Sequence, residues 1–177
     1  MAVPDRLGGV ATRPHLADPA AAGRLGPGLR RRGPLAAFVG LGLLWGGWAA
    51  LVPAVQEAVG ASKGTLGLAL LFVAVGSLPA MLFTGRELDR RGTSILPWLI
   101  VGLAIAAVLP AFAGSVPVLA LCLVGLGVAT GATDVAMNAA VSELEVREGT
   151  RLMQLAHGLY SAGWSGPGAV RSACARR

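Results

Sequence analysis

The stretch GTSILPWLIVGLAIAAVLPAFAGSVPVLALCLVGLGVATGAT, residues 92–133, runs for 42 residues without an Asp, Glu, Lys or Arg. A helix needs about 20 apolar residues to cross a hydrocarbon core of about 30 Å, so this stretch is long enough to cross a membrane twice. Near its middle, Pro110 and Pro117 bracket the short segment AFAGSV, which predicts a turn between two spans. The stretch therefore predicts an all-α integral membrane protein.

The composition of the whole chain agrees with a bilayer environment. Hydrophobic residues make up 54% of the sequence and charged residues only 14%, and the charges gather between long apolar runs. The net charge of +6 forms no amphipathic face or aromatic-interleaved patch, so nucleic-acid binding is not expected. Two separate cysteines and two isolated histidines supply no metal-ligand cluster, and no catalytic constellation is present. We therefore expect no metal, no cofactor and no enzymatic activity.

The apolar runs divide the chain into a tail, a bundle and an ending. Residues 1–33 are rich in Gly, Pro, Ala and Arg and are expected to form a disordered tail. The bundle covers residues 34–164, with four transmembrane helices and a partial fifth. The predicted spans are residues 34–55, 65–84, 95–113 and 116–142, and a fifth segment that starts near residue 152. Charged loops are expected over residues 85–94 and 143–151.

Arginine placement predicts the orientation. Eleven arginines of the tail and of the second and fourth loops would lie on one side, and Lys63 alone on the other. Short loops with excess Lys and Arg stay in the cytoplasm. The sequence therefore predicts a multi-pass protein of the cell inner (plasma) membrane with a cytoplasmic N-terminus.

Small residues recur at helical spacing in two spans. Gly42 and Gly46 stand four residues apart in the first, as do Gly127 and Gly131 in the fourth. Residues of this size let helix backbones approach closely in lipid, where no hydrophobic force drives helices together. The pattern predicts tight helix packing.

Asp134 is the only acid inside a predicted span, and on insertion scales a central Asp costs about 2.5–3.5 kcal/mol. Asn138 follows one turn later on the same face. Burial disfavours a charged carboxyl group, so Asp134 is a candidate for proton coupling and Asn138 for solute binding. Two alternatives stay open: an interhelical hydrogen-bond pair, and an interfacial capping role. Asp134 lies 17 residues after Pro117, about 25 Å along a helix and within the cytoplasmic third.

The segment between the second and third spans carries a specific motif. It reads Gly85-Arg-Glu-Leu-Asp89-Arg90-Arg-Gly92, the pattern G-x-x-x-D-R-x-G. The segment resembles the signature loop of the major facilitator superfamily, although Thr93 and Ser94 replace the basic residues that usually come next. The resemblance implies the N-terminal portion of a twelve-helix transporter fold. It also implies that Gly85, Asp89, Arg90 and Gly92 belong to a conformational latch.

A narrower resemblance concerns the fourth span and the start of the fifth. The segments DVAMN (134–138), GTRLM (149–153) and HGLYS (157–161) resemble a sugar-permease branch that includes fucose–proton symporters. That resemblance implies that Asp134 and Asn138 serve proton coupling and sugar recognition. His157 is a possible relay partner, or an interfacial histidine without that role. Trp45 and Trp48 of the first span could stack on a sugar ring, or serve helix packing alone.

The C-terminal residues and the family resemblance together lead to a predicted function. After Trp164 the apolar pattern collapses, and residues 165–177 read as an aberrant tail, as a frameshift or truncated gene model would produce. We expect an inactive fragment of a proton-coupled symporter for a small polar solute, lacking the C-terminal half of the transporter. Its partners would be the lipid bilayer, the solute and protons. The alternative is a non-transporting assembly or regulatory subunit of the membrane.

Overall fold

A computed structural model of the chain describes residues 27–174, with the side chains of residues 31–166. Every regular element within these residues is a helix. The five α-helices are α2 (Pro27–Ala58), α3 (Lys63–Arg91), α4 (Leu96–Val108), α5 (Val116–Glu148) and α6 (Met153–Cys174). Two short 3₁₀-helices flank α4, namely η1 (Gly92–Ile95) and η2 (Leu109–Phe112).

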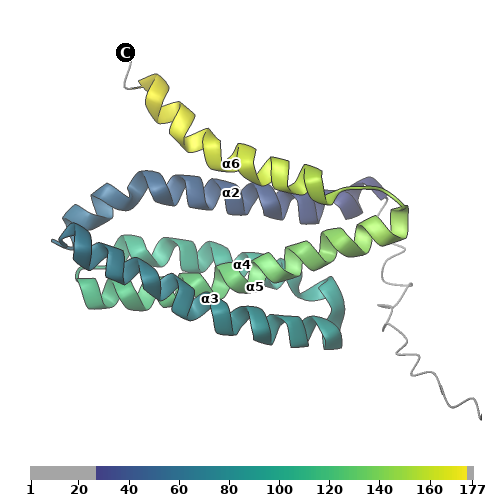
Figure 1. Ribbon diagram of the computed structural model, residues 1–177, viewed down its shortest axis with the longest axis horizontal. Helices are drawn as coiled ribbons and strands as arrows, with labels where there is room; N and C mark the ends of the chain where they lie inside the picture. The colour runs from purple at the N-terminus through teal and green to yellow at the C-terminus, as the bar shows by residue number, and fades with distance from the viewer. Residues whose placement is uncertain (1–26, 175–177) are drawn as a thin grey trace, which may run out of the picture.

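The helices run alternately up and down and form two groups (Figure 1). Helix α6 packs along α2 in one group, and α3 and α4 pack against α5 in the other. The starts of α2 and α6 and the ends of α3 and α5 meet at one end of the bundle. We call this the arginine-rich end, because it carries Arg31, Arg86, Arg91 and Arg147.

Glycines bring the helix backbones of each group into direct contact. A Cβ atom at Gly42 would collide with the carbonyl oxygen of Tyr160, and one at Gly46 with that of Trp164. In the other group, a Cβ atom at Gly127 would collide with the carbonyl oxygen of Val73. The close approach expected for the two glycine pairs is confirmed.

Helix α5 supplies the centre of the core. Its side chains Leu119, Leu123, Met137 and Val141 are almost fully buried, because α5 touches each of the other four α-helices. The hydroxyl group of Thr133, also buried, donates a hydrogen bond to the carbonyl oxygen of Leu99 (3.3 Å) and so joins α5 to α4. The helix with the intramembrane acid is therefore the one most firmly held.

Three segments within the described residues are long and apolar enough to cross a membrane: Arg31–Ala58, Lys63–Phe112 and Val116–Glu148. The middle segment has 50 residues and contains both α3 and α4, more than twice the length that one crossing needs. Helix α6 is not among the three. The all-α membrane class is confirmed, and the number of crossings stays a prediction.

The helices extend beyond several predicted boundaries. Helix α3 continues to Arg91 through most of the predicted 85–94 loop, and α5 continues to Glu148 through most of the 143–151 loop. Ion pairs one turn apart, Glu87 with Arg91 and Glu143 with Arg147, favour helix in both extensions. Gly92 and Gly149 then end the two helices with positive φ angles of 65° and 63°.

The two ends of the predicted bundle also differ. Helix α2 begins at Pro27, so residues 27–33 are helical rather than part of a disordered tail; residues 1–26 lie outside the described part. Helix α6 continues to Cys174, through most of the predicted aberrant tail, whose last three residues also lie outside the described part. Membrane helices tolerate the prolines and glycines that made both segments look irregular.

Candidate functional site

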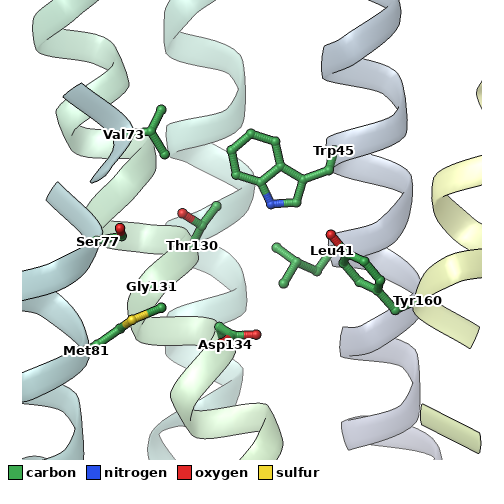
Figure 2. A pocket seen from close by; sticks show the side chains of 9 residues that line it. All are labelled: Leu41, Trp45, Val73, Ser77, Met81, Thr130, Gly131, Asp134 and Tyr160. Atoms are coloured by element: carbon green, nitrogen blue, oxygen red, sulfur yellow. The ribbon is translucent and has the colours of Figure 1, made fainter. Parts of the chain in front are cut away.

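A pocket of about 210 Å³ lies between the two helix groups (Figure 2). Four helices line it, and each contributes at least one side chain that points into the gap. The lining residues are Leu41 and Trp45 of α2; Val73, Ser77 and Met81 of α3; Thr130, Gly131 and Asp134 of α5; and Tyr160 of α6. Both helix groups therefore contribute side chains to the walls of the pocket.

Among the described residues that line the pocket, Asp134 is the only charged one. It is half-buried, and Gly131 lies one turn before it against Ser77 of α3. The hydroxyl group of Thr130 donates to the carbonyl oxygens of Leu126 and Gly127, at 2.8 and 3.0 Å. Because that hydroxyl is engaged with its own helix, the Asp134 carboxyl group is the strongest polar group that the pocket offers.

Asn138 contacts Asp134 but does not line the pocket. Its side-chain nitrogen donates to the backbone oxygen of Asp134 (2.8 Å) and to the carboxyl atom Oδ1 (3.3 Å). Among the described residues, no other side chain forms a hydrogen bond with that carboxyl group. The amide therefore orients the carboxyl group from the next turn of α5, and the second oxygen stays available to a bound solute or proton.

Two residues of α6 lie within electrostatic range of Asp134, namely His157 and Tyr160. The Nδ1 atom of His157 is 3.0 Å from the carbonyl oxygen of Met153, which can only accept, so Nδ1 carries a proton. The ring centroid of His157 is 5.2 Å from that of Phe38. His157 is exposed outside the pocket, whereas the Tyr160 ring reaches into it.

The two tryptophans of the first predicted span lie in different cavities. Trp45 projects into the pocket (Figure 2), whereas Trp48 lines an apolar groove of about 360 Å³ elsewhere on α2. Both tryptophans were candidates predicted from the sequence, whereas Ser77 and Tyr160 were not singled out. The missed residues on α3 share one signal, because Val73, Ser77 and Met81 follow each other at four-residue spacing along that helix.

The predicted latch segment lies at the arginine-rich end, away from the pocket. Gly85, Asp89 and Arg90 belong to the last turns of α3, and Gly92 begins η1. Asp89 and Arg90 are exposed, and among the side chains of residues 31–166 neither has an ion-pair partner. Next to them Thr93 donates to a carboxyl oxygen of Glu143 (2.9 Å), which joins η1 to α5.

The long apolar helices and the half-buried carboxyl group between them define a multi-pass membrane protein. The chain is 35% identical over 138 residues to an uncharacterized transporter of Sinorhizobium fredii, covering 75% of this chain and 35% of the relative. An uncharacterized MFS-type transporter of Yersinia pestis is 34% identical over 129 residues, 72% of this chain and 33% of the relative. Membrane protein MosC of Rhizobium meliloti is 33% identical over 126 residues, 69% of this chain and 30% of the relative.

These similarities support a relationship to transporters of the major facilitator superfamily. The chain spans about a third of the length of the curated relatives it matches. No family model matches the sequence, and no solved structure matches it.

Proposed function

We propose that this chain forms part of a secondary active transporter of the major facilitator superfamily, which moves a small polar solute such as a sugar together with protons. The transporter names of its relatives support membrane transport in general. The observation that carries the finer proposal is the pocket between the two helix groups, with Asp134 as the one charged residue among its described lining.

The pocket offers the contacts that a sugar requires. The Asp134 carboxyl group accepts hydrogen bonds from hydroxyl groups, and the rings of Trp45 and Tyr160 supply flat apolar faces and a polar edge each. The volume of about 210 Å³ is below the range of about 300–1,000 Å³ that is usual for ligand pockets. A small solute, or one part of a larger site, fits this volume.

Asp134 is the proposed proton carrier. An ionised carboxyl group inside the membrane is costly, and Asn138 is its one side-chain hydrogen-bond partner in the described part of the chain. Solute and proton would therefore favour each other, because a neutral carboxyl group can both donate to and accept from a solute hydroxyl group. In alternating access, the carboxyl group would release its proton when the pocket opens to the other side.

Transport is proposed to need further membrane helices, because the chain spans about a third of its transporter relatives. In such an assembly Asp89 and Arg90, exposed and without ion-pair partners among the described residues, would contact the added helices as a latch. We expect no solute uptake by vesicles that contain this chain alone.

Replacement of Asp134 by Asn tests the coupling. In a transporter completed with the helices that the longer relatives have, we expect Asp134→Asn to retain exchange of radiolabelled L-fucose across proteoliposomes. Accumulation driven by a pH gradient should be lost, because the amide cannot carry the proton. Glu57→Gln removes a carboxyl group outside the pocket and should leave both activities unchanged.

Unchanged accumulation in Asp134→Asn would contradict the proton role. Loss of exchange and accumulation together, in a protein that elutes as a single folded species, would assign Asp134 to solute binding alone.

A further inference from the structure

Two hydroxyl groups of the pocket donate hydrogen bonds to their own helices. The hydroxyl group of Ser77 donates to the carbonyl oxygen of Ala74 on α3 (3.4 Å), and that of Thr130 donates to carbonyl oxygens of α5. A hydroxyl group whose proton is engaged in this way offers a solute only its lone pairs. The wall formed by α3 and α5 therefore presents hydrogen-bond acceptors, and the ionised carboxyl group of Asp134 is the strongest of them.

The wall formed by α2 and α6 presents hydrogen-bond donors. Trp45 of α2 and Tyr160 of α6 line the pocket, and the polar side-chain atom of neither forms a hydrogen bond with a described residue. Figure 2 shows the indole nitrogen of Trp45 on the ring edge that faces the other labelled side chains. An indole N–H can only donate, whereas a phenolic hydroxyl group can donate and accept. A solute that satisfies Trp45 must therefore carry an acceptor on this side.

Close helix contacts fix the positions of these two residues relative to each other. Gly42 and Gly46 precede and follow Trp45 in the sequence, and both lie directly against the backbone of α6. A Cβ atom at Gly42 would collide with the carbonyl oxygen of Tyr160 itself. The ring centroid of Tyr160 is 6.4 Å from that of Trp164, one turn further along α6. The two polar groups are therefore in place before a solute binds, which lowers the entropy cost of binding.

The two walls together select the chemistry of the solute, because it must accept from Trp45 and donate to Asp134. A neutral compound with several hydroxyl groups does both. A quaternary ammonium ion carries no acceptor for the indole N–H. A carboxylate ion would meet the ionised Asp134, and the described lining of the pocket holds no basic residue that could neutralise either charge.

We propose that Trp45 is the specificity-determining residue of the pocket, and that its indole N–H donates to an oxygen of a neutral polyhydroxylated solute. Tyr160 supplies a second hydrogen bond from the same wall, and Asp134 accepts from a hydroxyl group at the opposite wall. The assignment rests on the proposed function, because it takes the pocket as the solute site. Sites that hydrogen-bond a substrate group reject analogues without that group far more strongly than apolar sites reject a change in size.

Proton–nitrogen NMR of the whole chain in nanodiscs tests the assignment. The chain has four tryptophans, and the signal that is lost in Trp45→Phe identifies the indole of Trp45. The probes are L-fucose and tetramethylammonium chloride. We expect L-fucose to shift the indole proton of Trp45 downfield, because a hydrogen bond to oxygen deshields it, and to leave the signal of Trp48 in the apolar groove unchanged. Tetramethylammonium, which has no acceptor, should shift neither signal.

Two phenylalanine substitutions supply the matched control. Trp45→Phe keeps an aromatic ring but removes the N–H, and we expect it to weaken L-fucose binding by about tenfold. Trp48→Phe makes the same change in the apolar groove and should bind L-fucose as the unsubstituted chain does. The indole signals that remain in each variant show whether it is folded.

Equal L-fucose affinities of Trp45→Phe and Trp48→Phe would overturn the assignment, and so would the absence of a Trp45 shift. A shift caused by tetramethylammonium and not by L-fucose would make the pocket a cation site instead. A Trp45 shift together with unchanged pH-driven accumulation in Asp134→Asn would retain the solute contact and reject proton coupling alone. Lost accumulation in Asp134→Asn without a Trp45 shift would retain proton coupling and reject the role of Trp45.

Discussion

At the residue scale, the glycine contacts show what spacing predicts and what it leaves open. The four-residue spacing of Gly127 and Gly131 indicated a close helix partner, and the structure provides one at Val73 and Ser77 of α3. The identity of the partner could not be predicted, because the glycine spacing is the same whichever helix approaches. The pocket residues Ser77 and Tyr160 were missed for the same reason.

Gly127 and Gly125 give a matched pair of substitutions on α5. We expect Gly127→Ala to destabilise the bundle by about 1–3 kcal/mol, because its Cβ atom would collide with the backbone of Val73. Gly125→Ala meets nothing within 4 Å and should be neutral or up to about 1 kcal/mol stabilising. Unfolding in mixed micelles measures both, and equal free energies of unfolding would contradict the glycine contact.

At the element scale, the charged segments were predicted as loops because their polarity marks the end of a membrane span. The helices α3 and α5 instead continue past the apolar region, with 29 and 33 residues against about 20 needed for one crossing. The composition predicts where the apolar part of a span ends. The end of the helix itself is determined by the ion pairs in its last turns and by the glycine that follows them.

The two glycines of the signature segment have different structural roles, although sequence treats them alike. Gly92 has a φ of 65° and a ψ of −166° at the end of α3, whereas Gly85 is helical with nothing within 4 Å of an added Cβ atom. We expect Gly92→Ala to cost about 1–2 kcal/mol of stability and Gly85→Ala to cost nothing. Thermal unfolding in detergent compares them; equal midpoints would show that the backbone at residue 92 relaxes without cost.

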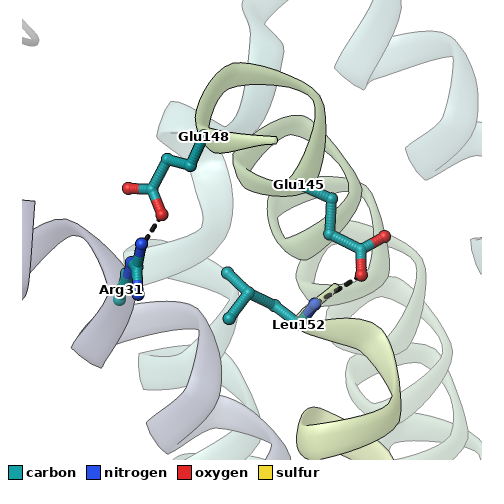
Figure 3. A network of polar contacts seen from close by, with 4 residues as sticks. All are labelled: Arg31, Glu145, Glu148 and Leu152. Carbon is teal, nitrogen blue, oxygen red and sulfur yellow. Dashed lines mark hydrogen bonds and ion pairs between the residues drawn. The ribbon is translucent and has the colours of Figure 1, made fainter. Parts of the chain in front are cut away.

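The start of α6 depends on a carboxyl group from α5. One oxygen of Glu145 accepts from the backbone nitrogens of Leu152 and Met153, at 2.5 and 2.7 Å (Figure 3). Beside it the ion pair of Arg31 with Glu148 joins α2 to α5. Both contacts lie at the arginine-rich end and connect the two helix groups there.

Loss of this cap should loosen α6. We expect Glu145→Ala to cost about 1–2 kcal/mol and to speed amide hydrogen exchange in the first turn of α6. Glu87→Ala removes an exposed pair on α3 and should change stability by only a few tenths of a kcal/mol. Unaltered exchange at Leu152 and Met153 in Glu145→Ala would show that the cap does not hold the helix.

At the scale of the whole molecule, the membrane class and most of the helices were predictable from long apolar runs. The pairing of α2 with α6 and of α3 with α5 was not, because lipid-exposed and buried faces are both apolar. The pocket arises from that pairing, so of its lining the sequence indicated only Asp134 on α5, where an acid breaks the apolar pattern, and Trp45 on α2.

The orientation can be tested through Lys63, the only lysine of the chain. With a cytoplasmic N-terminus, we expect an impermeant amine reagent to label Lys63 in intact cells, because the start of α3 would face outward. Peptide mass spectrometry identifies the labelled amine. A label on the N-terminal amine instead, with Lys63 unlabelled, would reverse the orientation.

The central claim is that Asp134 faces a water-accessible pocket within a membrane bundle. Its most direct test is the reaction of Asp134→Cys with a charged methanethiosulfonate reagent, in a background with Cys122 and Cys174 replaced by Ser. The lipid-facing control is Leu121→Cys in the same background, because Leu121 is 73% exposed on the opposite side of α5. We predict that the cysteine at position 134 reacts and the one at position 121 does not, because lipid keeps thiols un-ionised. An inert cysteine at position 134 beside a reactive one at position 121 would contradict the account.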